Sequence, residues 1–248
     1  MTRIAASLAA MALALSLAAC SQAATDTDRA ESAREFPRPD RPVAPLGANA
    51  FASEAEREKV NEAQIVMDMA AIEPGMTVAD IGAGEGYYTT RLSERVGREG
   101  RVLAQDIDAE ALRKLGLRVE RERLENTSIL RGEADDPRLP KASFDRIFLV
   151  HMYHEVAEPY AFLWRLRDGL RPGGRIIVVE ADRPAGQHGI PPALLFCEFK
   201  AVGYRLGAFV SKPELNGYYA RFDLGPQRPR PSDIQPCRAA DEVAAAAD

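Results

Sequence analysis

Short apolar runs alternate with longer amphipathic stretches along the middle of the chain. The runs have the length and composition of buried strands, and they lie at 77–81, 101–106, 128–130, 144–150 and 175–180. Apolar residues at helical spacing predict the intervening helices, at 88–96, 109–124 and 159–170. Because strands that alternate with helices pair in parallel, we predict an α/β fold with a parallel sheet between two helical layers.

The ends of this pattern extend the predicted domain to residues 51–225. Ser53 and Glu56 have the spacing of a helix N-cap with an acid at its third position, and apolar residues continue that helix to residue 71. The elements predicted after the last parallel strand are a helix at 193–201 and strands near 204–210 and 218–224. A short turn joins these two strands, so we expect an antiparallel strand at the C-terminal edge of the sheet.

The first twenty residues predict export. Arg3 is the one charge in residues 1–19, which otherwise form an apolar run ending in small residues, as in a signal peptide. Leu17 to Ser21 resembles a bacterial lipobox, which implies that Cys20 is acylated and anchors the chain to a membrane. By the same resemblance, Ser21 implies sorting to the outer membrane, with the domain facing the periplasm. A plain secretory signal with an incidental cysteine is the alternative.

Two segments outside the domain have the composition of disordered chain. Residues 20–50 contain Phe36 as their one aromatic residue, among scattered charges and prolines, so we expect a disordered tether. Residues 226–248 are rich in proline and end in an alanine-rich acidic stretch, so we expect a flexible tail. Cys237 lies in this tail, whereas Cys197 lies in a predicted helix and is expected to be buried. We therefore expect these two cysteines not to pair.

Composition narrows the classes of partner. With 32 basic and 37 acidic residues, the 248-residue chain has a formal net charge of −5 and no overall attraction for nucleic acid, which we exclude as a primary partner. Three cysteines are too few and too widely spaced for a disulfide framework or a four-ligand zinc site. A small organic or cell-envelope molecule is the class of partner that these exclusions leave.

The residues that carry chemistry begin where the first predicted strand ends. Gly82, Gly84 and Gly86 follow Asp80 closely and precede a helix, so the backbone can turn sharply and a ligand can approach main-chain atoms. Asp106 ends the next strand, where a carboxylate can accept both hydroxyls of a ribose. The two features together predict a nucleoside-type ligand, and a purely structural turn with a surface aspartate is the alternative.

The glycine spacing and its surroundings resemble the class I S-adenosylmethionine-dependent methyltransferases over about residues 60–224. The chain has Gly-x-Gly-x-Gly where dinucleotide enzymes prefer Gly-x-Gly-x-x-Gly. The likeness continues at 102–108, at 139–145 and in the Pro-Gly-Gly turn at 172–174. The resemblance implies a Rossmann-like three-layer sandwich with a seven-stranded, mostly parallel sheet and an antiparallel C-terminal strand. It also implies S-adenosylmethionine as the cofactor.

The same resemblance assigns cofactor contacts position by position. Asp80 would lie near the methionine amino group, and Asp106 would hold the ribose hydroxyls, with Ile107 against the adenine. The residues that would line the methionine and ribose portion are Gly82, Ala83 and Gly84. The candidates for the adenine edge are Glu133, Ala134 and Asp135. The family often has Gly-Asp-Ala at this point and this chain does not, so the choice between Asp135 and the two residues before it stays open.

The acceptor side begins at residues 150–155. His151 and His154 lie there, at the carboxyl edge of the sheet, where open α/β folds bind ligands. Histidine accepts protons near neutral pH, so we predict that His151 or His154 is a catalytic contact to the acceptor. A packing or helix-capping histidine is the alternative. His188, in a loop rich in glycine and proline, is expected to be exposed.

The residue types of this loop also fit a metal. His151 and His154 would lie on one face of a helix beside Glu155, but no third ligand is apparent, and we predict no metal site.

The sequence therefore predicts an exported, lipid-anchored methyltransferase that uses S-adenosylmethionine on a small-molecule or cell-envelope acceptor. Two alternatives stay open: a non-catalytic envelope lipoprotein on a methyltransferase scaffold, and a nicotinamide-dependent oxidoreductase.

Overall fold

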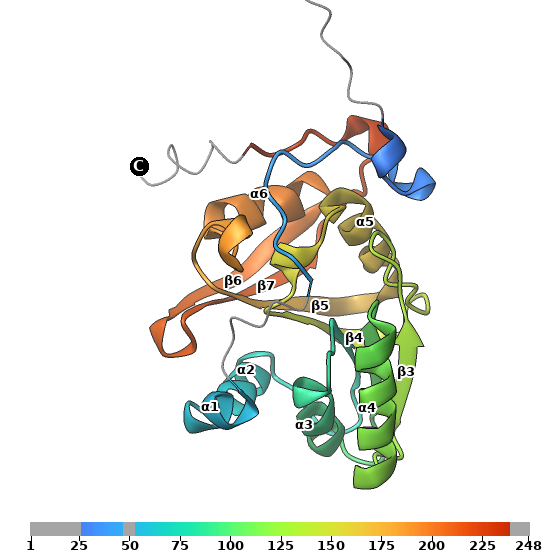
Figure 1. Ribbon diagram of the computed structural model, residues 1–248, viewed down its shortest axis with the longest axis vertical. Helices are drawn as coiled ribbons and strands as arrows, with labels where there is room; N and C mark the ends of the chain where they lie inside the picture. Colours follow the sequence, from blue (N-terminus) through green and yellow to red (C-terminus); the bar gives the residue numbers. More distant parts are fainter. Residues whose placement is uncertain (1–25, 47–52, 239–248) are drawn as a thin grey trace, which may run out of the picture.

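A seven-stranded sheet forms the middle layer of the protein in the computed structural model, which describes residues 26–46 and 53–238 (Figure 1). The strand order is β3-β2-β1-β4-β5-β7-β6, and β7 runs antiparallel to both of its neighbours. The strands are β1 (Thr77–Ile81), β2 (Arg101–Asp106), β3 (Thr127–Arg131), β4 (Phe144–Val150), β5 (Leu170–Glu180), β6 (Tyr204–Lys212) and β7 (Gly217–Leu224). The predicted mostly parallel, Rossmann-like sheet is confirmed. The predicted signal peptide and Cys20 lie outside the described residues.

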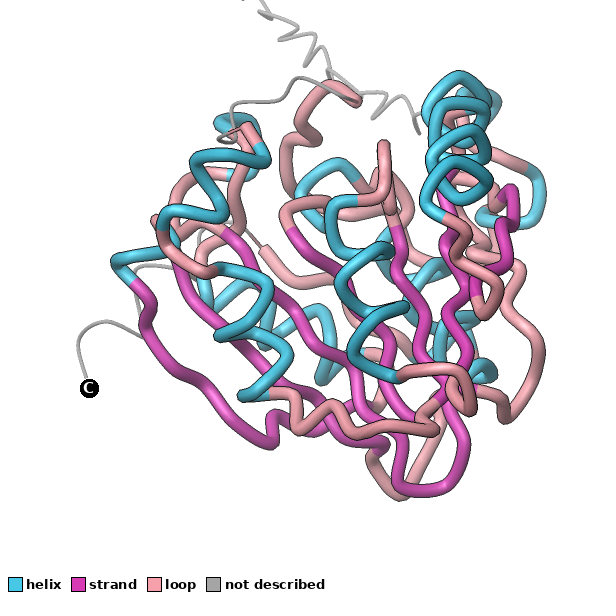
Figure 2. The backbone as a smooth tube through the Cα atoms, turned by 90° about the horizontal axis from the view of Figure 1, so that it is seen from below, coloured by secondary structure: helices cyan, strands magenta, loops and turns pink. Residues whose placement is uncertain are grey.

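Helices cover both faces of this sheet (Figure 2). They are α1 (Glu54–Lys59), α2 (Glu62–Met69), α3 (Tyr87–Val96), α4 (Ala109–Glu122), α5 (Pro159–Gly169) and α6 (Pro192–Ala201). Alternate residues of β4 point to opposite faces, so Phe148 packs with α2 and α3, whereas Ile147 and Leu149 pack with α5 and α6. No helix in the described ranges is long and apolar enough to cross a membrane.

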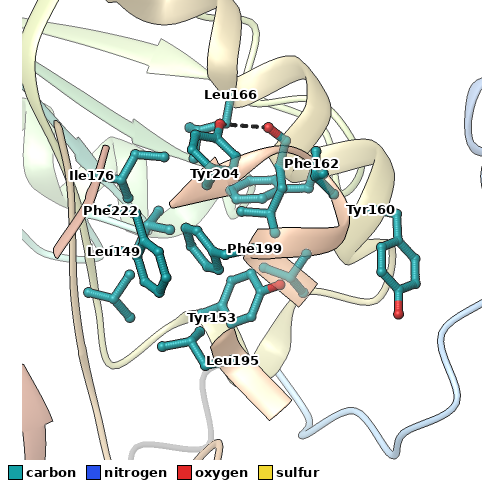
Figure 3. Packing of buried hydrophobic residues seen from close by; sticks show 14 of the residues in the cluster. Leu149, Tyr153, Tyr160, Phe162, Leu166, Ile176, Leu195, Phe199, Tyr204 and Phe222 are labelled. Atoms are coloured by element: carbon teal, nitrogen blue, oxygen red, sulfur yellow. Dashed lines mark hydrogen bonds between the residues drawn. The ribbon is translucent and has the colours of Figure 1, made fainter. Parts of the chain in front are cut away.

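Aromatic rings fill the core beneath α6 (Figure 3). Phe199 of α6 stacks on Phe222 of β7 with ring centroids 3.9 Å apart, and the ring of Tyr153 lies 5.5 Å from that of Phe199. The hydroxyl of Tyr204 donates to the carbonyl oxygen of Leu163 at 2.8 Å, which ties β6 to α5. This packing positions the 3-10 turn η3 (Tyr153–Glu155) that follows β4.

The helix predicted from Ser53 to residue 71 is two helices. Ser53 and Glu56 form the expected capping box of α1, but Asn61 adopts a left-handed conformation with φ 52° and separates α1 from α2. Asparagine tolerates this region better than most residues. The break turns the side chain of Glu62 inward, where it is buried.

Residues 26–46 do not form the disordered tether that their composition predicts. They include two 3-10 turns, η1 (Asp26–Asp28) and η2 (Glu31–Ala33), and they bury Ala33, Phe36 and Ala44 against the domain. Phe36 packs edge-on against Trp164 of α5, with ring centroids 5.7 Å apart. We call residues 26–46 the N-terminal strap.

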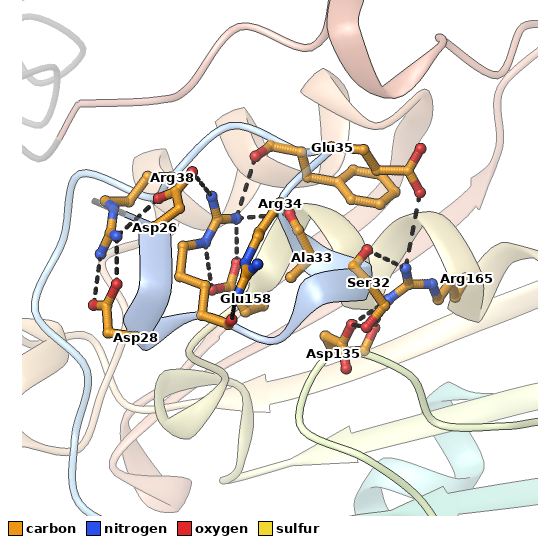
Figure 4. Close-up of polar contacts among 12 residues, drawn as sticks. Asp26, Asp28, Ser32, Ala33, Arg34, Glu35, Arg38, Asp135, Glu158 and Arg165 are labelled. Carbon is orange, nitrogen blue, oxygen red and sulfur yellow. Dashed lines mark hydrogen bonds and ion pairs between the residues drawn. The ribbon is translucent and has the colours of Figure 1, made fainter. Parts of the chain in front are cut away.

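Two buried arginines fasten the N-terminal strap, and Figure 4 shows Glu158, the partner of the first. Arg29 donates to both carboxylate oxygens of Glu158, at 2.7 and 2.6 Å. Arg41 donates to Glu198 of α6 at 2.8 Å, and both side chains are 1% exposed. Buried charges require such partners, and each partner lies more than a hundred residues away in sequence, so composition alone could not reveal the attachment.

The C-terminal segment is also packed rather than flexible as far as residue 238. Cys197 and Cys237 form a disulfide, so the expectation that they do not pair is wrong. The backbone N–H of Cys237 donates to the hydroxyl of Tyr160 at 2.6 Å, and Ile234 is buried. Asp40 and Arg238 form a β-bridge, so the two terminal segments lie side by side, blue and red in Figure 1.

We expect Arg41→Ala to lower the free energy of unfolding by about 3–5 kcal/mol, because it leaves the buried carboxylate of Glu198 without its ion partner. Arg38→Ala in the same N-terminal strap is the matched control. Arg38 pairs with Asp26 and Asp28 but is 42% exposed, so its loss should change stability little. Urea unfolding of both variants measures the difference, and equal losses would contradict a buried attachment at Arg41.

Candidate functional site

Three glycines with positive φ connect β1 to α3, and they do so for different reasons. The φ angles of Gly82, Gly84 and Gly86 are 67°, 55° and 91°. A Cβ on Gly82 would lie 2.9 Å from the side chain of Met152, and one on Gly86 would lie 2.5 Å from Leu115. A Cβ on Gly84 would meet nothing within 4 Å. Gly82 and Gly86 therefore permit close packing, whereas Gly84 leaves its backbone open to a ligand.

The structure brings Asp106 to this glycine turn, as predicted. Its Oδ2 atom accepts the backbone N–H of Gly84 at 2.8 Å, and its Oδ1 atom accepts that of Asp108 at 2.9 Å. A carboxylate has about four lone-pair positions, so two acceptor positions remain for hydroxyl groups. This arrangement fits the ribose of a nucleoside cofactor. Ile107, the next residue, is half-buried.

Asp80 lies beneath the turn and is buried. Burial raises the pKa of Asp80 to about 6, even though the hydroxyl of Thr89 donates to its Oδ2 atom at 2.6 Å and Arg57 favours the charged form. A cationic group at this position would be stabilised by the ionised carboxylate. Asp80 therefore fits the amino group of a methionine-derived cofactor.

The adenine-edge candidates have different surroundings. Asp135 is buried and accepts from Ser32 of the N-terminal strap at 2.6 Å and from Arg165 at 2.5 Å (Figure 4). Its carboxylate therefore already has hydrogen-bond partners, one in the strap and one in α5. Glu133 and Ala134 are exposed, and they stay predicted cofactor contacts.

His151 points toward the face of the sheet that α1 and α2 cover. It adopts φ 53°, and its Nε2 atom lies 3.4 Å from Oε1 of Glu62. The same oxygen accepts from Arg57 at 2.6 Å and from the hydroxyl of Tyr88 at 3.1 Å. Burial alone raises the pKa of Glu62, but the hydrogen bonds and charges of His151 and Arg57 outweigh it and lower the pKa to about 2.

His154 points the other way. Its Nδ1 atom lies 2.8 Å from Oε2 of Glu180, the last residue of β5, which is fully buried. The backbone N–H of Tyr153 donates to Oε1 of Glu180 at 2.7 Å. The two histidines therefore do not share one helical face, because His151 precedes η3 and its positive φ turns the chain. His188 is half-buried, not exposed, and its ring centroid lies 5.5 Å from that of His154.

The carboxylates that face the two histidines, Glu62 and Glu180, were not predicted from the sequence. Glu180 ends an otherwise apolar strand, and a charge in that position is a usable signal for a site at the carboxyl edge. Glu62 gives no such signal, because acids are common in the first turn of a surface helix. A separate surface groove, lined by residues that include Arg91, Glu94 and Arg95, contains none of the predicted cofactor contacts.

The central part of the chain is similar to known proteins. Residues 78–174 match a family model described as a methyltransferase domain. The ubiquinone/menaquinone biosynthesis C-methyltransferase UbiE of Shewanella frigidimarina is 31% identical over 120 residues, which cover 48% of this chain and 47% of that protein. UbiE of Escherichia fergusonii is 30% identical over 127 residues, 49% of each chain. The chain thus spans about half the length of the curated relatives it matches.

Solved structures share the fold at low identity. A SAM-dependent methyltransferase from Aquifex aeolicus has a TM-score of 0.59 and 24% identity, and the match covers 69% of this chain and 97% of that one. The [4+2]-cyclase SpnF has a TM-score of 0.56 and 16% identity, covering 69% of this chain and 67% of that one. The matched segment at 78–174, together with this fold, supports a class I S-adenosylmethionine-dependent methyltransferase, and S-adenosylmethionine is the cofactor that they imply.

Proposed function

We propose that this protein transfers a methyl group from S-adenosylmethionine to a small-molecule or cell-envelope acceptor. The observation that carries the proposal is the hydrogen bond between Gly84 and Asp106, which joins the open glycine turn to a carboxylate at the carboxyl edge of the sheet. The family match over residues 78–174 supports the same activity. This match favours neither of the two alternatives, a nicotinamide-dependent oxidoreductase and a non-catalytic lipoprotein.

The residues around the turn have separate tasks in this proposal. Asp106 would accept the ribose hydroxyls, and Asp80 would face the amino group. Ile107, with Glu133 and Ala134, would border the adenine. The bound cofactor supplies a methyl group on a sulfonium, so the protein mainly has to align donor and acceptor.

A base is needed only for acceptors that lose a proton. His151 is the candidate for this task, because its Nε2 atom lies 3.4 Å from the carboxylate of Glu62, which would orient the imidazole ring. His154, which pairs with Glu180, stays a second candidate contact to the acceptor.

Transfer of a radiolabelled methyl group to a library of small molecules tests the activity itself. The library should include quinols and phenols, since the relatives are named for ubiquinone and menaquinone biosynthesis. No labelled product, with cofactor bound, would favour a non-catalytic scaffold over an enzyme.

We expect Asp106→Ala to weaken the affinity for S-adenosylhomocysteine by about 10- to 100-fold, because hydrogen bonds to a charged group contribute roughly 1.5–3 kcal/mol. Isothermal titration calorimetry measures the change. Glu85→Gln is the matched control, since this exposed carboxylate lies in the same turn but pairs with Lys114. Asp106→Asn, which keeps one acceptor for Gly84, should be intermediate. If Asp106→Ala leaves the affinity for S-adenosylhomocysteine unchanged, the proposed nucleoside site is wrong.

The raised pKa of Asp80 predicts a pH dependence. Below about pH 6 this carboxyl is largely protonated, and only the ionised form attracts the cationic amino group of the cofactor. The affinity for S-adenosylhomocysteine should therefore rise about tenfold between pH 5 and pH 8 and level off above the pKa. Asp80→Asn, which keeps an acceptor for Thr89, should remove most of this rise. Identical pH profiles for both proteins would contradict the assigned role.

We further propose that the chain is exported and anchored through Cys20, facing the periplasm at the outer membrane. The Cys197–Cys237 disulfide supports this location, because disulfides persist in oxidising compartments. Labelled fatty acid should be incorporated into the wild-type chain and not into Cys20→Ala, while Ser21→Ala remains labelled. A thiol-reactive probe should modify Cys197 and Cys237 only after reduction. Protein that incorporates no labelled fatty acid and has free thiols at Cys197 and Cys237 would contradict the proposed location.

A further inference from the structure

We propose that His154, Glu155 and His188 bind a divalent transition-metal ion of the zinc class. Each residue offers one ligand atom, and these atoms all lie within 4.8 Å of one another. Ligand atoms around a tetrahedral zinc ion lie about 3.4 Å apart, given zinc–nitrogen distances of about 2.0–2.1 Å. Nε2 of His154 is already 3.9 Å from Oε1 of Glu155, so small side-chain movements suffice to close the site.

The surroundings of His154 are those of a metal ligand. A ligating histidine commonly donates its second ring nitrogen to a carboxylate, which fixes the tautomer and the ring orientation. Glu180 provides that carboxylate, at 2.8 Å from Nδ1, and it is fully buried. Glu180 is in turn held by the backbone N–H of Tyr153. With the proton on Nδ1, Nε2 carries the lone pair that binds a metal.

His188 supplies a third ligand from a separate loop, which the sequence pattern around His154 does not indicate. It follows the 3-10 turn η4 (Ala185–Gln187) with φ 57°, and η4 lies against η3. Its Nδ1 atom is buried and has no hydrogen-bond partner within the described part of the chain. A buried nitrogen without a partner is costly, and a metal bound at Nδ1 would supply one.

The donor set indicates the class of metal. Two imidazoles and one carboxylate favour zinc and its neighbours among transition metals over calcium or magnesium, which prefer oxygen ligands. Three protein ligands also leave one coordination position for water or an oxygen atom of a small molecule, as in catalytic rather than structural zinc sites. His151 is not part of the set, because its ring faces Glu62.

The proposed metal site lies next to the candidate cofactor site. His154 and Glu155 follow Met152, whose side chain covers Gly82 of the glycine turn, so the metal site and the candidate cofactor site flank one short loop. Ala44 of the N-terminal strap donates its backbone N–H to the carbonyl oxygen of His154 at 3.2 Å and so helps to hold η3. Metal binding by these side chains does not require a ligand at the glycine turn.

Metal titration of the full chain tests the proposal. The protein carries no affinity tag and has Cys20→Ser, so that the only other cysteines are those of the disulfide, and a chelator removes bound metal first. Calorimetry with Zn²⁺ should give one ion per chain, and Co²⁺ should develop the visible absorption of a low-coordinate nitrogen and oxygen site. His188→Ala should lose at least tenfold in Zn²⁺ affinity together with this absorption.

His151→Ala is the matched histidine control and should keep both signals. Thermal unfolding shows whether each variant is folded, and the half-buried loop position of His188 makes that substitution the informative one. Weak or non-stoichiometric binding to the wild type, or equal binding to His188→Ala, would overturn the site. S-adenosylhomocysteine affinity is measured in parallel, so that a failed metal site and a failed cofactor site are told apart.

Discussion

A carboxylate buried at the end of β5 controls the shape of the loops at the carboxyl edge. Glu180 is fully buried, and it accepts the backbone N–H groups of Tyr153 and His154 as well as Nδ1 of His154. A buried charge is tolerated only when its hydrogen bonds are satisfied, so the chain after β4 must turn to supply these donors. That turn directs His154 toward η4 and leaves His151 facing Glu62 on the opposite side. One acid thus separates the surroundings of two histidines that stand three positions apart.

Buried ion pairs explain why the N-terminal strap is ordered despite its composition. The strap has few apolar residues, but Arg29 and Arg41 reach Glu158 and Glu198 inside the domain. Glu198 also accepts from the hydroxyl of Tyr153, so it joins η3 to the strap. Such a network is costly to break at one member, because the remaining charge stays buried. The strap is therefore part of the folded domain that surrounds the candidate sites.

The two candidate sites share a loop and differ in chemistry. On one side, the glycine turn and Asp106 offer backbone and carboxylate groups suited to a nucleoside, and Met152 packs directly on Gly82. On the other side, His154 and His188 offer nitrogen ligands with Glu180 behind them. A ligand at the open metal position would lie at the same edge of the sheet where α/β proteins bind their substrates.

The sequence by itself determined the order of the strands and helices along the chain. It also determined the glycine turn and the approach of Asp106 to this turn. These features depend on local conformation and on parallel pairing, which brings the ends of neighbouring strands together. The break at Asn61 and the early start of β5 at Leu170 were not predicted, because tertiary contacts choose among local conformations of similar energy.

Only the tertiary structure decided which distant side chains meet. Cys197 and Cys237 are 40 residues apart, and Arg41 and Glu198 are 157 apart. His188 reaches His154 from a separate loop. No local pattern encodes such pairs, since their partners meet only when the fold brings segments that are far apart in sequence together.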